Sequence, residues 1–285
     1  MSRPPAPVPL RTLIDADSVC RSDPCDAGCV LGSFWPHSRT SFESRVVKGF
    51  KECVPASEYE PHISALSEFY AQRILDTVRD WRFDWVVRVL SSAETKPDHR
   101  RPLAVLVDTL CRLTGSRDAT HLFFKSDSRP PMRAVGRLSG PEAMRARVSC
   151  VVQDLFIRPS NLGGTALLVD DIANTGASMR VYAWALKSCA IIERVVAVNL
   201  AATRFANGRD GRGMLTLDTA NLDLYPGLGP VFVDSRLMFH VLGDCPAVHP
   251  PTAVEMRFLA DRRAAPCTSC CGAPVPKRKW WRLLS

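Results

Sequence analysis

Residues 166–178 read Ala166-Leu-Leu-Val-Asp170-Asp171-Ile-Ala-Asn174-Thr175-Gly176-Ala177-Ser178, and the architecture of the chain can be argued from this run. Its apolar start, over residues 165–169, predicts a buried strand, and residues 177–188 predict a helix. Two adjacent carboxylates and a short loop with hydroxyls and a glycine connect the two elements. A strand that enters a helix through a tight loop is typical of α/β proteins.

The alternation of strands and helices continues on both sides of this run. Patterns of apolar residues predict helices over residues 58–80 and 102–113, and strands over residues 84–90, 121–124 and 194–200. Strands separated by helices imply right-handed crossovers and a mainly parallel sheet. We therefore expect an α/β fold with a mainly parallel sheet flanked by helices. Residues 126–147 contain several prolines, glycines and arginines, and they predict a long functional loop.

The residues after the strand favour a sugar phosphate as ligand. In parallel sheets, ligands bind at the carboxyl ends of strands, and the N–H groups at a helix start bind phosphate. Gly176 permits close approach of the backbone, while Thr175 and Ser178 add hydroxyl donors. The carboxylates of Asp170 and Asp171 suit a polyol such as ribose, or a magnesium ion. The alternative is purely structural, with Asp171 and Thr175 capping the helix.

The run resembles the phosphoribosyl-diphosphate (PRPP) binding motif of type I phosphoribosyltransferases, which has four apolar residues followed by Asp-Asp-x-x-Thr-Thr-Gly-x-Thr. Asn174 stands in place of the first Thr and Ser178 in place of the last. The resemblance implies that Asp170 and Asp171 bind the ribose hydroxyls. It also implies a 5′-phosphate site formed by the loop residues Ala173, Asn174, Thr175, Gly176, Ala177 and Ser178.

Over residues 83–204, including Trp85-Val-Val-Arg-Val-Leu90 and the segment Arg100-Arg-Pro-Leu-Ala-Val-Leu-Val, the chain is similar to the ComF-like subgroup of this family. The resemblance implies a type I phosphoribosyltransferase fold and a pyrophosphate loop that contains Ser91, Ser92 and Lys96. It further implies that Lys125 and the arginines between residues 129 and 147, Arg137 among them, face the diphosphate as catalytic groups.

Two functions follow from this resemblance. The first is a phosphoribosyltransferase, which binds PRPP or a nucleoside monophosphate with Mg²⁺ and transfers phosphoribose to or from a nitrogenous base, with pyrophosphate as co-product. The second is a catalytically silent nucleotide sensor or scaffold of the same fold, which acts with a nucleic-acid or protein partner. The Asp-Asp pair favours ligand binding under both hypotheses, and a homo-oligomer is compatible with either.

The composition excludes several classes of protein. In 285 residues, 46% are hydrophobic and 23% are charged, which is enough apolar material for a folded core and argues against a disordered, collagen-like or coiled-coil chain. No window offers the roughly 18 to 20 apolar residues of a membrane-spanning helix, and residues 1–17 lack the apolar stretch of a signal peptide. These features predict a cytoplasmic protein.

Eleven cysteines, several of them clustered near the two ends, indicate possible metal sites. Cys267 and Cys270 form a Cys-x-x-Cys pair that Cys245, His240 or His249 could complete as a zinc site. A second candidate contains Cys20, Cys25 and Cys29 with His37 or Cys53, or the two ends share one ion. Free thiols are the alternative for both clusters. We expect an irregular, cysteine-containing extension over residues 1–57, a phosphoribosyltransferase-like domain over 58–205 and an accessory region over 206–275.

Residues 276–285 form a basic aromatic tail. The net charge of the chain is +8, and the segment from Arg257 to Ser285 holds seven basic residues against one acidic residue. Paired tryptophans among lysines and arginines are typical of segments that bind single-stranded nucleic acid or another anionic surface. A disordered terminus without a binding role is the alternative.

Overall fold

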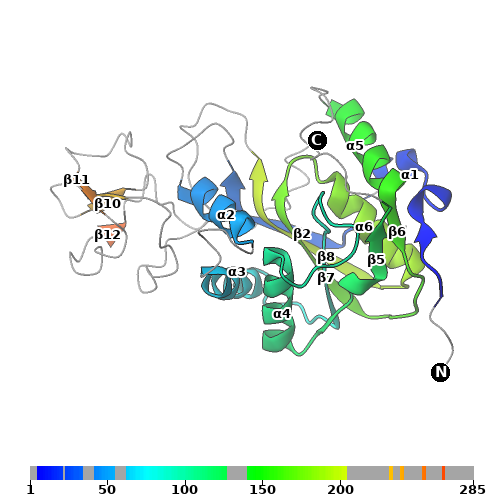
Figure 1. Cartoon of the computed structure of the whole chain (residues 1–285), viewed down its shortest axis with the longest axis horizontal. Coiled ribbons are helices and arrows are strands. Elements are labelled where there is room, and N and C mark those ends of the chain that lie inside the picture. The colour runs from blue at the N-terminus through cyan, green and yellow to red at the C-terminus, as the bar shows by residue number, and fades with distance from the viewer. Residues whose placement is uncertain are drawn as a thin grey trace.

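The computed structural model describes residues 5–21, 23–34, 42–54, 62–126 and 140–203, together with four short strands between residues 231 and 266 (Figure 1). Five parallel strands form the central sheet in the order β2-β8-β7-β3-β4. Their bounds are β2 Ala27–Phe34, β8 Arg194–Thr203, β7 Thr165–Ala173, β3 Trp85–Arg88 and β4 Arg117–Asp118. The predicted α/β fold with a parallel sheet flanked by helices is confirmed.

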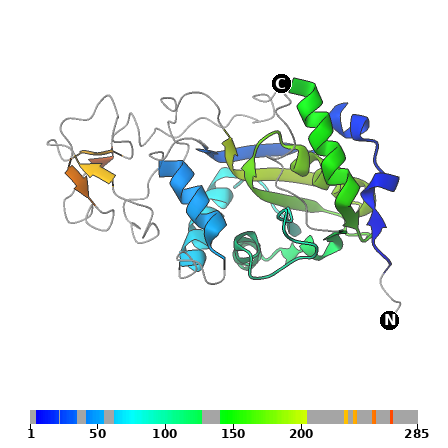
Figure 2. The same ribbon diagram turned by 45° about the horizontal axis from the view of Figure 1, so that its top comes forward.

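Helices cover both faces of this sheet (Figures 1 and 2). One face carries α2 (Phe42–Glu52), α3 (Ile63–Thr77) and α4 (Pro102–Thr114), whose buried residues share one hydrophobic cluster. The other face carries α1 (Ala16–Arg21), α5 (Gly140–Asp154) and α6 (Ala177–Cys189), which share a second cluster. We call these the α2 face and the α6 face.

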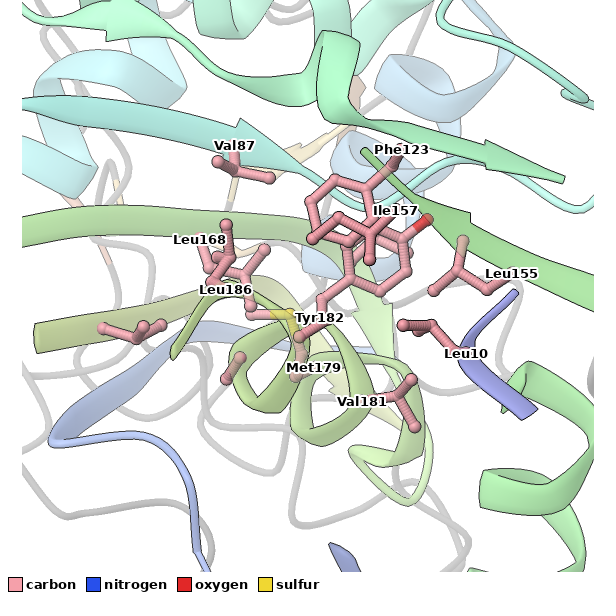
Figure 3. Close-up of a cluster of buried hydrophobic side chains, with 14 of the residues drawn as sticks. Leu10, Val87, Phe123, Leu155, Ile157, Leu168, Met179, Val181, Tyr182 and Leu186 are labelled. Atoms are coloured by element: carbon pink, nitrogen blue, oxygen red, sulfur yellow. The ribbon is translucent and has the colours of Figure 1, made fainter. Parts of the chain in front are cut away.

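The side chains of β7 alternate between the two clusters, as expected for a strand covered on both sides. Leu167 and Val169 lie in the cluster of the α2 face, whereas Ala166 and Leu168 lie in that of the α6 face. Figure 3 shows the second cluster, where the rings of Tyr182 and Phe123 stack with their centroids 4.4 Å apart. Strand β7 therefore packs against a hydrophobic cluster on each face of the sheet.

Local sequence explains the ends of α4. The helix begins at Pro102, whose missing N–H would have no partner in the first turn. It ends at Gly115, which adopts a left-handed conformation with φ of 74° and donates its N–H to the carbonyl of Cys111. Both signals were readable in the sequence, and the predicted helix over residues 102–113 is confirmed within one residue.

The predicted strand over residues 121–124 is wrong in its position and its partners. Residues Thr120–Leu122 form a 3-10 turn, and the strand that follows, β5 (Phe123–Lys125), leaves the central sheet. It pairs with β6 (Leu155–Ile157), which also pairs with β1 (Val8–Pro9), in a separate antiparallel sheet. The edge strand of the central sheet is instead β4. It is only two residues long, which is too short to show the alternation of apolar and polar residues that predicts a strand.

The expectation that residues 1–57 form an irregular extension is also wrong for the described part. Strand β2 pairs with β8 from Ala27 to Phe34 and so belongs to the central sheet. The helix α2 follows it and buries Val46, Val47 and Phe50. Gly28 and Gly32 interrupt the apolar pattern of this strand, because a glycine contributes no side chain to either face. The α/β unit therefore includes β2 and α2, which precede the predicted domain boundary at residue 58.

The long loop predicted over residues 126–147 does not include residues 140–147, because α5 begins at Gly140, and residues 127–139 lie outside the described residues. The accessory region contains a four-stranded sheet in the order β11-β9-β10-β12. Its strands are β9 Val231–Val233, β10 Met238–His240, β11 Thr252–Val254 and β12 Ala265–Pro266. Within the described part of the chain, no helix is long and apolar enough to cross a membrane.

Candidate functional site

The candidate site lies where the connections of the central sheet diverge. The strands β3 and β7 are neighbours, paired from Trp85↔Ala166 to Arg88↔Val169. From β3 the chain continues to β4 on one side, whereas from β7 it continues to β8 on the other side. At such a switch point, open α/β sheets bind ligands outside the carboxyl ends of the two central strands. The loops that follow β3 and β7 begin at this edge of the sheet.

Asp170 and Asp171 lie inside β7, because the strand extends to Ala173 instead of ending at Val169 as expected. The backbone N–H of Asp171 donates to Oδ1 of Asp170 at 2.9 Å, and that of Ile172 donates to Oδ1 of Asp171 at 2.6 Å. Both carboxylates are partly exposed. They therefore stand at the carboxyl end of the strand, within reach of a ligand.

Adjacent positions in a strand point to opposite faces of its sheet, and this separates the two carboxylates. Asp170 is paired with Asn199 of β8 and continues the row of Leu168 on the α6 face. Asp171 meets the α2 face, where its Oδ2 lies 2.6 Å from Nζ of Lys51 in α2. One carboxylate thus belongs to each face, so the pair can hold a ligand that straddles the end of β7.

The phosphate loop predicted after the carboxylates connects β7 to α6. Asn174 and Thr175 are partly exposed, and Gly176 has φ of 76°, the left-handed region that glycine adopts without strain. Gly176 is also the N-cap of α6, and glycine has no side chain that could cap the helix. Asp171, which would cap the helix under the purely structural alternative, instead accepts the N–H of Ile172 and forms an ion pair with Lys51. The first N–H groups of a helix have no partner within that helix, and its positive dipole end favours an anion there.

A buried ion pair shapes the loop after β3. Arg88, 2% exposed, donates from Nη1 and Nη2 to the two carboxylate oxygens of Glu94 at 2.9 and 2.7 Å. Glu94 in turn accepts the backbone N–H groups of Ser91 at 2.7 Å and Asp98 at 3.2 Å. Burial alone would raise the pKa of Glu94, but the hydrogen bonds and the positive charge of Arg88 lower it below its ordinary value. Glu94 is therefore ionised, and it stabilises this loop by accepting hydrogen bonds from its backbone.

Lys125 has a different position from the one expected. Its side chain is buried, and Nζ donates to the carbonyl oxygen of Leu90 at 3.2 Å and to that of Ser91. Tyr182 of α6 accepts the N–H of Leu90 at 3.1 Å. The role of Lys125 toward a diphosphate stays a prediction, and its observed bonds lie within the protein. Lys125 holds the start of the predicted pyrophosphate loop next to α6.

The other residues predicted for pyrophosphate binding are less enclosed. Ser92 is half-buried and Lys96 is exposed. Two arginines of the predicted basic loop lie in α5 instead, where Arg145 pairs with Asp17 at 2.7 Å and Arg147 is buried. Arg137 lies outside the described residues.

Sequence reasoning missed four residues that surround this site: Arg88, Glu94, Lys51 and Asn199. The sequence did indicate that Asn199 is unusual, because it is the one polar residue between Val195 and Ala202 in a buried strand. Lys51 had no such indication, since it lies about 120 residues from Asp171 in the chain and only the fold brings the two together.

The cysteines of the described part give no support to a metal site near the amino terminus. Burial raises the pKa of Cys25 to about 12, so its thiol keeps its proton. No group of three or more His, Cys, Asp or Glu residues that could hold a metal ion occurs among the described residues. Cys245, Cys267, Cys270 and the basic tail lie outside them. In comparisons with known proteins, no family model and no curated protein matches this chain.

Proposed function

We propose that this protein binds PRPP or a nucleoside monophosphate and transfers phosphoribose to or from a nitrogenous base, with pyrophosphate as co-product. The observation that carries the proposal is the location of the Asp170-Asp171 pair and the uncapped start of α6 at the switch point between β3 and β7. A polyol site and an anion site side by side suit a sugar phosphate. The type I phosphoribosyltransferase fold belongs to the same proposal.

Each part of the ligand has a matching group in the site. The N–H groups at the start of α6, next to Gly176, would hold the 5′-phosphate. Asp170 and Asp171 would accept hydrogen bonds from ribose hydroxyls or bind Mg²⁺. Magnesium fits this donor set, because it is commonly bound through one or two carboxylates together with substrate phosphates. The loop after β3, which Glu94 stabilises through hydrogen bonds, would bind the pyrophosphate.

The reaction would be a displacement at carbon 1 of ribose. A bond forms from a base nitrogen to this carbon, the bond from the carbon to the diphosphate oxygen breaks, and pyrophosphate leaves with the electron pair while the base loses a proton. Magnesium would neutralise charge on the leaving group. The residues of the chain need only orient the ligand and stabilise the developing charges, so no covalent nucleophile is required.

A ligand-binding protein without turnover is the second candidate, and a specific observation favours it. Two basic residues that contact the predicted pyrophosphate loop, Arg88 and Lys125, are buried and bonded within the protein. Glu94 also adds a negative charge beneath the loop, although Arg88 compensates for it. A loop arranged in this way can bind a nucleotide and yet assist poorly in the departure of pyrophosphate.

The test combines calorimetry with a pyrophosphate assay. Wild-type protein is titrated with PRPP and with nucleoside monophosphates in the presence and absence of Mg²⁺, and pyrophosphate release is followed with PRPP and a panel of purine and pyrimidine bases. Binding together with release supports the transferase. Binding without release for any base supports the second candidate, and no binding of any of these ligands contradicts both.

A further inference from the structure

The ion pair between Lys51 and Asp171 brings a cation to the candidate site from a part of the chain that the proposed function does not use. Nζ of Lys51 lies 2.6 Å from Oδ2 of Asp171. The Lys51 side chain is 52% exposed and that of Asp171 is 18% exposed. The cation is therefore held against the carboxylate while part of its surface still faces solvent.

Lys51 and the phosphate loop approach the end of β7 from opposite faces of the sheet. Helix α2, which carries Lys51, buries Val46, Val47 and Phe50 in the cluster of the α2 face. Helix α6, whose start would hold the 5′-phosphate, packs into the cluster of the other face. Lys51 thus lies across the strand end from that phosphate position, and one phosphate group cannot easily contact both.

The negative charges of the site favour a cation next to Asp171. Two carboxylates repel a ligand that carries several phosphates, and Arg88 and Lys125 are committed to Glu94 and to backbone carbonyls. Lys51 has three N–H donors, so it can contact Asp171 and a phosphate oxygen at the same time. Its side chain is partly exposed, so a ligand can approach it for that second contact.

We propose that Lys51 binds a second anionic group of the ligand, separate from the phosphate at α6, and thereby selects the diphosphate ester PRPP over a sugar monophosphate. This inference rests on the proposed function. Lys51 is then a specificity residue: its charge matters for the affinity of the doubly phosphorylated ligand, whereas the monophosphate does not reach it.

The test uses calorimetry with PRPP and ribose 5-phosphate, both with Mg²⁺, on wild type, Lys51→Met, Lys51→Arg and Lys48→Met. Lys48 is the matched control, because it lies one turn earlier on α2 and pairs with Glu52 at 3.6 Å instead of with the site. Lys51→Met should weaken PRPP on the order of tenfold and leave ribose 5-phosphate within about twofold. Lys51→Arg should retain most of the affinity for PRPP, and Lys48→Met should change neither ligand.

The outcomes separate this inference from the proposed function. Wild-type protein that binds neither ligand would contradict both. Wild-type protein that binds PRPP, with unchanged or tighter binding in Lys51→Met, would overturn the role of Lys51 and leave the proposed function in place. An equal loss for both ligands would overturn the second anionic contact. The melting temperature of each variant identifies a loss of binding that arises from unfolding.

Discussion

Asp170 of β7 and Asn199 of β8 are direct partners in the parallel sheet, and Asn199 is fully buried. In the described part of the chain, neither Oδ1 nor Nδ2 of Asn199 has a hydrogen-bond partner. A buried polar group without a partner costs about 1–3 kcal/mol, so an amide in this row destabilises the fold. A polar residue that lowers the stability of the fold and lies next to a candidate ligand-binding residue is typical of a functional site.

Replacement of Asn199 by Leu should therefore raise stability and weaken ligand binding. Leu has the same branching as Asn and removes both unsatisfied atoms, so we expect the free energy of unfolding to rise by about 1–2 kcal/mol. The affinity for PRPP should fall, because the amide next to Asp170 is lost. Urea unfolding and calorimetry measure the two effects. A less stable variant would indicate that the amide has a partner in solution.

Arg88→Met should be strongly destabilising. The substitution leaves the buried carboxylate of Glu94 without its bidentate partner, and breaking a buried pair in this way costs about 3–5 kcal/mol. The double variant Arg88→Met with Glu94→Leu removes both charges and should recover part of this loss. Chemical denaturation of the three proteins provides the comparison. Equal stability of the two variants would show that the unpaired charge is not the cause.

The same pair predicts a pH dependence of stability. The pKa of Glu94 is lower in the folded protein than its ordinary value of 4.5, because the bonds from Arg88 outweigh burial. Ionised Glu94 therefore contributes stability above about pH 4.5, and this contribution disappears as the pH falls toward the lower folded pKa. In Glu94→Gln the decrease in stability below pH 4.5 should be shallower than in wild type.

The measurement is the denaturation midpoint from pH 3 to 7, a range on the order of the carboxylate titration. Glu142→Gln, at an exposed carboxylate of α5, is the control and should follow the wild-type curve. Parallel curves for wild type and Glu94→Gln would contradict the assignment of a lowered pKa to Glu94.

The acidic pair should be needed for binding and dispensable for folding. Asp170→Asn together with Asp171→Asn removes carboxylates that are partly exposed at a strand end, so no cavity opens. We expect loss of Mg²⁺-dependent binding of PRPP and nucleoside monophosphates, with a melting temperature near that of wild type. Asp80→Asn, at an exposed carboxylate remote in sequence, serves as control. Unchanged affinity in the double variant would remove the site assignment.

Gly176→Val should weaken phosphate binding, whereas Asn174→Thr should be neutral or improve it. Valine strains the left-handed backbone at Gly176 by about 1–3 kcal/mol and places a side chain next to the first N–H groups of α6. Gly115→Val is a matched control for strain, because Gly115 has φ of 74° at the end of α4. It should lower stability by a similar amount and leave ligand affinity unchanged. Equal loss of affinity in Gly176→Val and Gly115→Val would contradict this interpretation.

Several elements of the fold were predictable because their signals are local. The β7–α6 unit follows from an apolar run, a loop with Gly176 and a helical pattern within about 25 residues. Helix α4 is bounded by Pro102 and Gly115, whose backbone preferences act at the residue itself. Candidate ligand residues at the end of β7 follow from the same reasoning, since parallel sheets bind ligands at that edge.

The arrangement around the site required the tertiary structure. Strand β2 joins the sheet by pairing with β8, about 170 residues later in the chain, and no local pattern records that pairing. The family resemblance implied that Lys125 faces a diphosphate, but its burial depends on where Leu90 and Ser91 lie in the folded chain. The ion pair of Lys51 with Asp171 and the pairing of Asn199 with Asp170 depend on contacts in the same way.

The difference between the features that the sequence predicted and those that required the tertiary structure has a physical origin. Backbone preferences and hydrophobic periodicity act over a few residues, so the amino acids of one segment specify its own strand or helix. The partner of a charged or polar side chain depends on which distant segments pack together, and this is a property of the whole core. The sequence therefore identifies residues 166–178 as a candidate ligand-binding run, and the fold decides that its two carboxylates face Lys51 on one side of the sheet and Asn199 on the other.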